Sequence, residues 1–160
     1  MRNKCFHTGR KLSVAALLAA LSVGYAPGES SAQNQQYPRM ARLEQYLIAD
    51  RSAEIALARS AAPTAISSGA TVLVLTRGGY ETAARGTNGF VCLVDRAWQA
   101  PFAEPEFWNP KIRAPVCLNP QAARSVLPLQ QKRTEWALAG LSKDEILARL
   151  KAAIAEKGEG

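Results

Sequence analysis

The sequence predicts an α+β fold in which a small antiparallel sheet is covered by helices on both sides. Residues 71–96 hold three short runs with strand character, separated by Gly78-Gly79 and Asn88-Gly89, dipeptides typical of two-residue hairpin turns. Apolar residues recur at helical spacing before and after this stretch. The third run is followed by Ala97–Asn119, a segment rich in aromatic residues whose prolines forbid a helix or a central strand.

The three runs predict a three-stranded β-meander. Pairing outward from the first turn places Leu75 opposite Thr82. The second turn pairs the second strand with the third and places Glu81 opposite Arg96 near an exposed end. Both faces of this sheet are apolar, so we expect helices to cover both of them.

The N-terminal part has the features of a secretory signal peptide, residues 1–32. Basic residues precede an apolar run from Leu12 to Ala26, and Ser30-Ser31-Ala32 provides the small residues that a signal peptidase reads. Cleavage is therefore expected after Ala32, with a site after Ala26 as the alternative. A retained membrane anchor is the other alternative, although the run is short for the roughly 20 residues that span a bilayer. We expect a secreted or periplasmic protein without stable membrane insertion after cleavage.

The positive charge of the chain belongs largely to this leader. The leader holds 4 of the 20 basic and 1 of the 13 acidic residues, so the chain that follows carries +4 rather than +7. It contains no block of lysine and arginine and no basic helical stripe with aromatics, so we expect no nucleic-acid partner. Residues 33–160 suit one globular domain, with 33–37 and 158–160 expected to be disordered.

The segment before the sheet, Pro38–Ser60, is expected to be helical because Met40, Leu43 and Leu47 recur at helical spacing. Asp50 is also a good N-cap residue, so the segment could instead form two helices. The sequence leaves both alternatives open.

Two helices are expected after Asn119-Pro120, because a capping residue followed by proline is typical of a helix start. The first runs to about Val126. The second spans Pro128–Ala139 and ends at Gly140, where a C-terminal cap belongs. Its predicted buried residues are Leu129, Trp136 and Leu138.

The last helix is expected to begin at a capping box, in which Ser142 and Glu145 satisfy each other's backbone N–H groups. The apolar side of this helix is formed by Leu147, Leu150 and Ile154.

The residue inventory excludes several chemistries. The only histidine, His7, lies in the leader, which excludes histidine-dependent nucleophilic catalysis and imidazole metal sites after cleavage. With Cys5 also removed, only Cys92 and Cys117 remain, too few for a four-thiolate zinc site in one chain. We therefore expect no metal and no cofactor.

Cys92 and Cys117 are expected to form a structural disulfide, because export takes the chain into an oxidising compartment. The bond would pin the proline-rich segment across one face of the sheet and contribute about 3–4 kcal/mol through loop closure. A redox-active pair is the alternative, but these cysteines lack the Cys-x-x-Cys spacing of such sites.

The proline-rich segment is the predicted binding surface because it combines aromatic rings with polar and cationic groups. The candidate ligand-binding residues are Trp98, Phe102, Phe107, Trp108, Asn109, Lys111 and Arg113. The alternative is that the rings fill the open face of the sheet beneath the loop.

The leading functional hypothesis is a non-enzymatic binding or interaction module of the cell envelope or extracellular space, with a protein, peptide or glycan as partner. The alternative is a small cell-envelope hydrolase in which Glu104 or Glu106 acts, because glycosidases place two carboxylates beside stacking aromatics.

Overall fold

The structure, a computed structural model, describes residues 37–158. Within this part of the chain the α-helices are α1 (Arg51–Arg59), α2 (Thr64–Ser67), α3 (Pro120–Ser125), α4 (Leu127–Leu138) and α5 (Lys143–Gly158). Two short 3₁₀ helices are η2 (Leu43–Gln45) and η3 (Ala97–Gln99). The strands are β1 (Thr71–Thr76), β2 (Gly79–Ala84), β3 (Val91–Asp95) and β4 (Ala114–Leu118). The predicted signal peptide lies outside the described residues.

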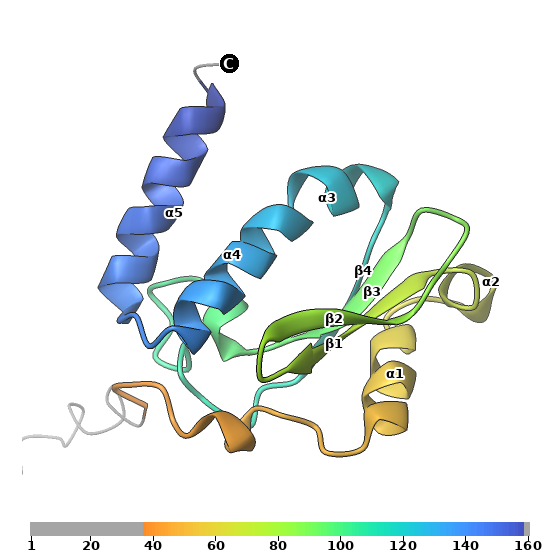
Figure 1. Cartoon of the computed structure of the whole chain (residues 1–160), viewed down its shortest axis with the longest axis horizontal. Coiled ribbons are helices and arrows are strands. Elements are labelled where there is room, and N and C mark those ends of the chain that lie inside the picture. Colours follow the sequence, from red (N-terminus) through yellow and green to blue (C-terminus); the bar gives the residue numbers. More distant parts are fainter. Residues whose placement is uncertain (1–36, 159–160) are drawn as a thin grey trace, which may run out of the picture.

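The four strands form one mixed sheet in the order β2-β1-β3-β4. β1 is antiparallel to β2 and parallel to β3, and β3 is antiparallel to β4. α1 packs on one face of the sheet and α4 lies over the other, so helices do lie on both sides (Figure 1). The combination of helices with a small sheet is confirmed, whereas the three-stranded antiparallel meander is not.

The predicted pairing of the second strand with the third is wrong, because β3 pairs with β1 in parallel. The turn residues at 88–89 belong to a connection that passes beside the end of α2 instead of a hairpin. Asn88 Nδ2 donates to the Ile66 carbonyl at 2.7 Å, and the Thr87 N–H donates to the Gly69 carbonyl at 2.9 Å. These bonds hold the connection against the start of β1, which places β3 beside β1.

The first hairpin is confirmed with a shifted register. Thr76 pairs with Gly79 and Leu75 with Tyr80, so the turn is Arg77-Gly78 and the predicted Leu75–Thr82 pairing is wrong. Thr76 closes the turn, because its hydroxyl accepts from Gly78 N at 3.1 Å and donates to the Gly79 carbonyl at 2.9 Å. Gly79 is the first residue of β2, and its φ of 115° is a conformation that favours glycine.

The proline-rich segment contains β4, an edge strand that the sequence analysis did not predict. Pro115 pairs with Val94 within it. Proline is tolerated there because one side of an edge strand makes no ladder hydrogen bonds.

The disulfide between Cys92 and Cys117 is confirmed. The two cysteines are direct partners in the β3–β4 ladder, with their Cα atoms 4.0 Å apart. The bond therefore holds the edge strand against its neighbour, rather than pinning a loop across a face of the sheet. Both cysteines belong to an apolar cluster that also contains Ala58 of α1, Val72 of β1 and Val94 of β3.

The helix predicted over Pro38–Ser60 is found only as α1, preceded by the short η2. Asp50 caps α1 by accepting from Ser52 N at 2.8 Å, in agreement with the alternative of separate segments. Tyr46 explains the interruption. Its fully buried hydroxyl donates to the Trp108 carbonyl at 2.7 Å and accepts from Ala41 N at 3.1 Å, which draws this segment into the core.

A buried ion pair occupies the place where β1 and β3 diverge. Arg96 Nη2 lies 2.8 Å from Glu54 Oε1, and both side chains are at most 1% exposed. The same oxygen accepts from Leu75 N at 3.0 Å, and Arg96 Nε donates to the Tyr46 carbonyl at 2.7 Å. The predicted surface pair of Glu81 with Arg96 is therefore wrong, because Arg96 turns inward to the carboxylate on α1.

The C-terminal helix boundaries are close to those predicted. Asn119 caps α3 by accepting from Ala122 N at 2.8 Å, and Gly140 ends α4 with a φ of 82°. The capping box is also confirmed, since Ser142 N donates to Glu145 Oε2 at 2.8 Å and Glu145 N donates to Ser142 Oγ at 3.3 Å.

Candidate functional site

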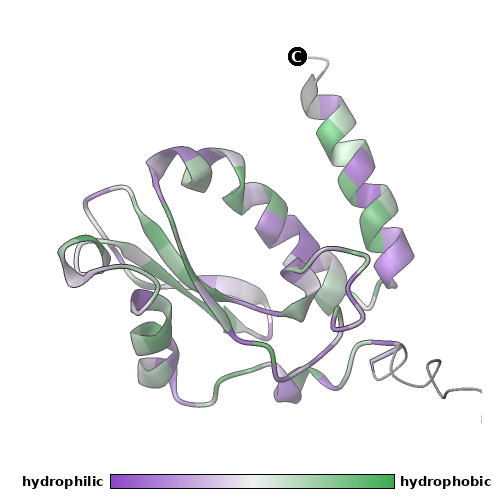
Figure 2. Cartoon of the chain, turned by 180° about the vertical axis from the view of Figure 1, so that it is seen from behind, coloured by the Kyte–Doolittle hydropathy of each residue, from purple (hydrophilic) through white to green (hydrophobic). Residues whose placement is uncertain are grey.

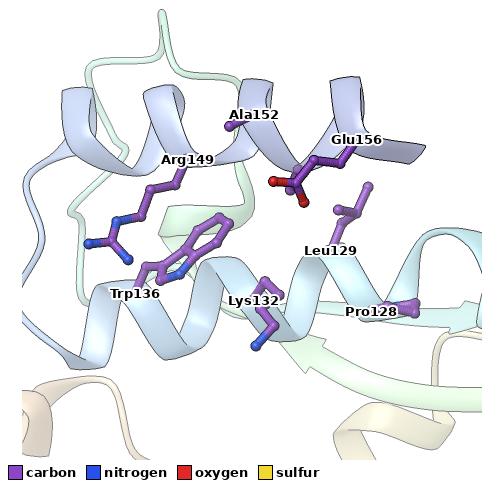
Figure 3. Close-up of a pocket in the computed structure, with 8 residues that line it drawn as sticks. Pro128, Leu129, Lys132, Trp136, Arg149, Ala152 and Glu156 are labelled. Carbon is purple, nitrogen blue, oxygen red and sulfur yellow. The ribbon is translucent and has the colours of Figure 1, made fainter. Parts of the chain in front are cut away.

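An apolar groove runs between α4 and α5 and has a volume of about 470 Å³. We call it the α4–α5 groove. It is lined by Pro128, Leu129, Lys132 and Trp136 from α4 and by Arg149, Ala152, Ala153 and Glu156 from α5. Figure 3 shows Leu129 and Trp136 directed from α4 toward α5, with Arg149 beside the indole and Glu156 near Leu129. The groove is therefore apolar in its interior, with a cation at one end of its α5 wall and an anion at the other.

The groove is open because α5 is held to the molecule mainly through its first turns. Ile146 is fully buried in the core, Leu150 is half-buried, and Ile154 is 52% exposed. Figures 1 and 2 show α5 projecting from the body of the molecule, with hydrophobic residues along its length. The apolar side predicted for α5 therefore extends beyond the part of the helix that packs against the core.

The crevice between the two helices is open on a second side. A smaller groove of about 250 Å³ is lined there by Gln99, Val126, Leu129, Gln130, Arg133, Leu150 and Ile154. Leu129 lines both grooves, and Val126 is 43% exposed. Apolar side chains thus flank the outer half of α5 on two sides.

α4 directs different residues to the core from those predicted. Thr134 and Ala137 are buried, and the Thr134 hydroxyl accepts from Trp98 Nε1 at 3.1 Å. The three residues predicted for the buried side, Leu129, Trp136 and Leu138, are half-buried. Trp136 does pack against the core, but Trp136 and Leu129 also line the α4–α5 groove. α4 therefore presents apolar side chains both to the core, through Ala137 and Trp136, and to the groove beside α5, through Leu129 and Trp136.

Three of the four aromatic rings predicted to bind a ligand lie in the core. Trp98, Phe107 and Trp108 are at most 4% exposed and belong to one hydrophobic cluster with Tyr46. Phe102 is half-buried and is stacked on Phe107, at 5.1 Å between ring centroids. These rings fill the molecule beneath the loop, which was the alternative interpretation.

The polar members of the predicted site stabilise the loop. Asn109 Oδ1 accepts from Lys111 N at 2.9 Å, and the Lys111 side chain is exposed. Arg113 donates to the carbonyls of Gln45 at 2.9 Å and Pro110 at 2.6 Å. The structure therefore does not gather the predicted residues around one open cavity, and their ligand-binding role stays a prediction.

The two carboxylates of the hydrolase alternative lie in the same loop. Glu104 is exposed, and Glu106 is half-buried and accepts a hydrogen bond from Asn109 Nδ2. Neither carboxylate lines the two grooves beside α5, nor a third groove of about 600 Å³ between residues 38–41 and the start of α5. Their catalytic role stays a prediction.

A buried carboxyl group lies between the sheet and α4. Asp95 is 8% exposed, and burial raises its pKa to about 6 despite the nearby Arg96 and Arg133. Its Oδ2 accepts from Gln130 Nε2 at 3.1 Å, whereas Asp95 Oδ1 and Gln130 Oε1 have no hydrogen-bond partner among the residues that the structure describes. Burial also raises the pKa of Tyr80, whose hydroxyl donates to the Val94 carbonyl at 2.7 Å.

Within residues 37–158 no three side chains of histidine, cysteine, aspartate or glutamate lie together in a way that could hold a metal ion. No helix in the same range is both long and apolar enough to cross a membrane.

Sequence reasoning did not identify the α4–α5 groove, although part of its signal was visible. The apolar residues of the last helix, Leu147, Leu150 and Ile154, extend over more turns than one small sheet could cover. Whether they would be buried depends on the angle between α4 and α5, which no local pattern specifies.

Comparison with protein-family models, with curated proteins and with solved structures gives no match to this chain, so its function has to be argued from the groove itself.

Proposed function

We propose that this protein is a non-enzymatic interaction module of the periplasm or extracellular space, and that its α4–α5 groove binds an apolar helical segment of a protein partner. The confirmed disulfide supports the compartment, because such bonds persist mainly in oxidising environments.

The observation that carries this proposal is the uncovered outer half of α5. A helix in water gains most of its stability from packing an apolar face, because isolated helices of this length are marginal. The outer turns of α5 have little such packing, as the 52% exposure of Ile154 indicates. A partner that covers this half would stabilise the helix that it binds.

The shape and chemistry of the groove favour a helical partner. Leu129 and Trp136 line one wall and the small residues Ala152 and Ala153 line the other, so the groove is bounded by two helices. A groove of this kind accepts the apolar face of a third helix, whose side chains fit at spacings of three and four residues. Trp136 supplies a large half-buried ring of the type that dominates binding energy.

The proposal is tested by placing a photo-crosslinking benzophenone side chain at Ala153, inside the groove, in cells that export the protein. The matched control carries the same side chain at Lys151, which is exposed and does not line the groove. We expect a discrete adduct from position 153 and none from position 151, with the partner identified by mass spectrometry.

The partner is then purified and titrated against the A153E and K151E variants. A153E should weaken binding at least about tenfold, because it introduces a charge into an apolar contact, and K151E should leave binding unchanged. Equal adducts at both positions, or unimpaired binding by A153E, would contradict the proposal.

A further inference from the structure

We infer that the occupant of the α4–α5 groove is α5 of a second copy of this chain, so that the protein forms a two-fold symmetric dimer through the groove. This inference rests on the proposed function and names its partner.

The charges of the α5 wall are arranged for pairing with themselves. Arg149 and Glu156 line the groove seven residues apart, on one side of the helix and about 10 Å apart along its axis. Ala152 and Ala153 lie midway between them. Reversing the direction of the helix about this midpoint places an arginine where the glutamate was and a glutamate where the arginine was.

A two-fold axis makes use of this arrangement. In a symmetric dimer any contact from one residue to a second residue is repeated in the opposite sense. An antiparallel pair of α5 helices therefore brings Arg149 of each copy to Glu156 of the other, which gives two ion pairs per dimer. Within residues 37–158 of one copy, neither side chain forms an ion pair, so both charges are available to a partner.

Small residues at the centre of the pairing would let the two α5 helices approach each other closely. Helix axes come within about 8 Å only where the contacting side chains are small. Ala152 and Ala153 occupy the middle of the pairing, and each would meet the other across the axis. Leu129 and Trp136 from α4 would close over the sides of the inserted helix.

The charge order also favours a second copy over other partners. Arg149 and Glu156 at opposite ends of the α5 wall give that wall no net charge, and Lys132 on the α4 wall is paired with Glu135 at 2.8 Å, so the groove does not select an acidic or a basic peptide. It selects a helix with the opposite order of charges and small residues between them. The chain itself supplies such a helix, α5 in the reverse direction.

Charge reversal tests the inference directly. We expect sedimentation velocity of the purified chain to show a monomer–dimer equilibrium that shifts with concentration in the micromolar range. R149E and E156R should each weaken dimerisation about tenfold, because each variant replaces two attractive pairs with two repulsive ones. The double variant R149E/E156R should restore the affinity of the original chain. The matched control K151E changes the same charge on the opposite side of α5 and should have no effect.

The double variant distinguishes a loss of contact between the two copies from a loss of stability of α5. R149E also places a like charge four residues from Glu145, so its thermal unfolding is measured as well. The double variant keeps the repulsion between Glu145 and the glutamate at position 149. Restored dimerisation would therefore result from the ion pairs between the two copies.

A chain that stays monomeric, or a double variant that does not recover, overturns the inference. If the chain is monomeric and position 153 crosslinks to another protein, the inference fails while the proposed function stands. If the chain is monomeric and position 153 gives no adduct, both fail. A dimer adduct at position 153 together with recovery in the double variant supports both.

Discussion

Glu54 and Arg96 show how single residues decide the geometry of this sheet. The carboxylate on α1 accepts from Leu75 N and from the guanidinium, at a point where β1 and β3 no longer pair. Glu54 thus replaces a strand as the hydrogen-bond partner of β1. A sequence pattern cannot anticipate this arrangement, because both residues are types normally found on surfaces and lie 42 residues apart.

We predict that E54Q lowers the free energy of unfolding by about 3 kcal/mol, because it leaves the buried Arg96 guanidinium without its counter-charge. The matched control is E135Q, which removes a partner of Lys132 from a pair whose side chains are both more than half exposed. It should change the free energy by less than about 1 kcal/mol. Denaturant unfolding of both variants, with the disulfide intact, measures the two free energies of unfolding. Equal values for E54Q and E135Q would argue against a structural role for the buried pair.

Asp95 predicts a pH dependence of stability. Its pKa is raised by burial to about 6 from 3.8, so the folded state binds more protons than the unfolded state between these two values. Stability contributed by this group is therefore fully present below about pH 4 and is lost as the pH rises through 6. D95N should remove this loss and stabilise the protein at pH 7 by about 1–3 kcal/mol.

The same substitution supplies an amide donor near Gln130 Oε1, which accepts no hydrogen bond within residues 37–158. Unfolding measured at pH 4 and at pH 7 checks the prediction. The gain from D95N should be larger at pH 7, and a gain independent of pH would show that the titration of Asp95 does not contribute.

At the scale of elements, helix ends and the presence of the first hairpin agree with the prediction, whereas the register of that hairpin and the pairing of the third strand do not. The first hairpin, the end of α4 at Gly140 and the capping box of α5 each depend on a few adjacent residues, and each was predicted. The parallel β1–β3 pairing depends on bonds from the 85–90 connection to α2 and to Gly69, which no local periodicity contains.

The connection between β2 and β3 requires a glycine at position 86. A Cβ there would lie 2.2 Å from Thr71 N and 2.4 Å from the Gly69 carbonyl oxygen, both of which are backbone atoms that cannot move aside. We predict that G86A lowers the free energy of unfolding by about 3 kcal/mol, since the connection must move away from β1. G78A is the control, because the nearest atom to its Cβ is the Thr76 hydroxyl at 3.8 Å.

Thermal unfolding compares the two glycine variants. G86A should unfold at a clearly lower temperature than G78A, which should lie within a few degrees of the original chain. Similar midpoints for the two would mean that the 85–90 connection does not lie against the start of β1.

For the whole molecule, the sequence allowed a mixed fold and a disulfide to be predicted, but not the surface that we propose to be functional. Of the four aromatic residues predicted to bind a ligand, Trp98, Phe107 and Trp108 belong to the core with Tyr46, because a long irregular segment needs buried rings to hold it in place. The groove was missed because α4 and α5 each look like ordinary amphipathic helices. The gap between them depends on the angle at which α5 packs against α4, which the pattern of neither helix contains.

The attachment of α5 through its first turns has a consequence for how this protein can change over time. Most of the hydrogen bonds, the disulfide and both apolar clusters lie before residue 147. Substitutions in the last turns of α5 therefore cost the folded body little, and natural variation there would change the proposed binding surface while the rest of the chain keeps its shape.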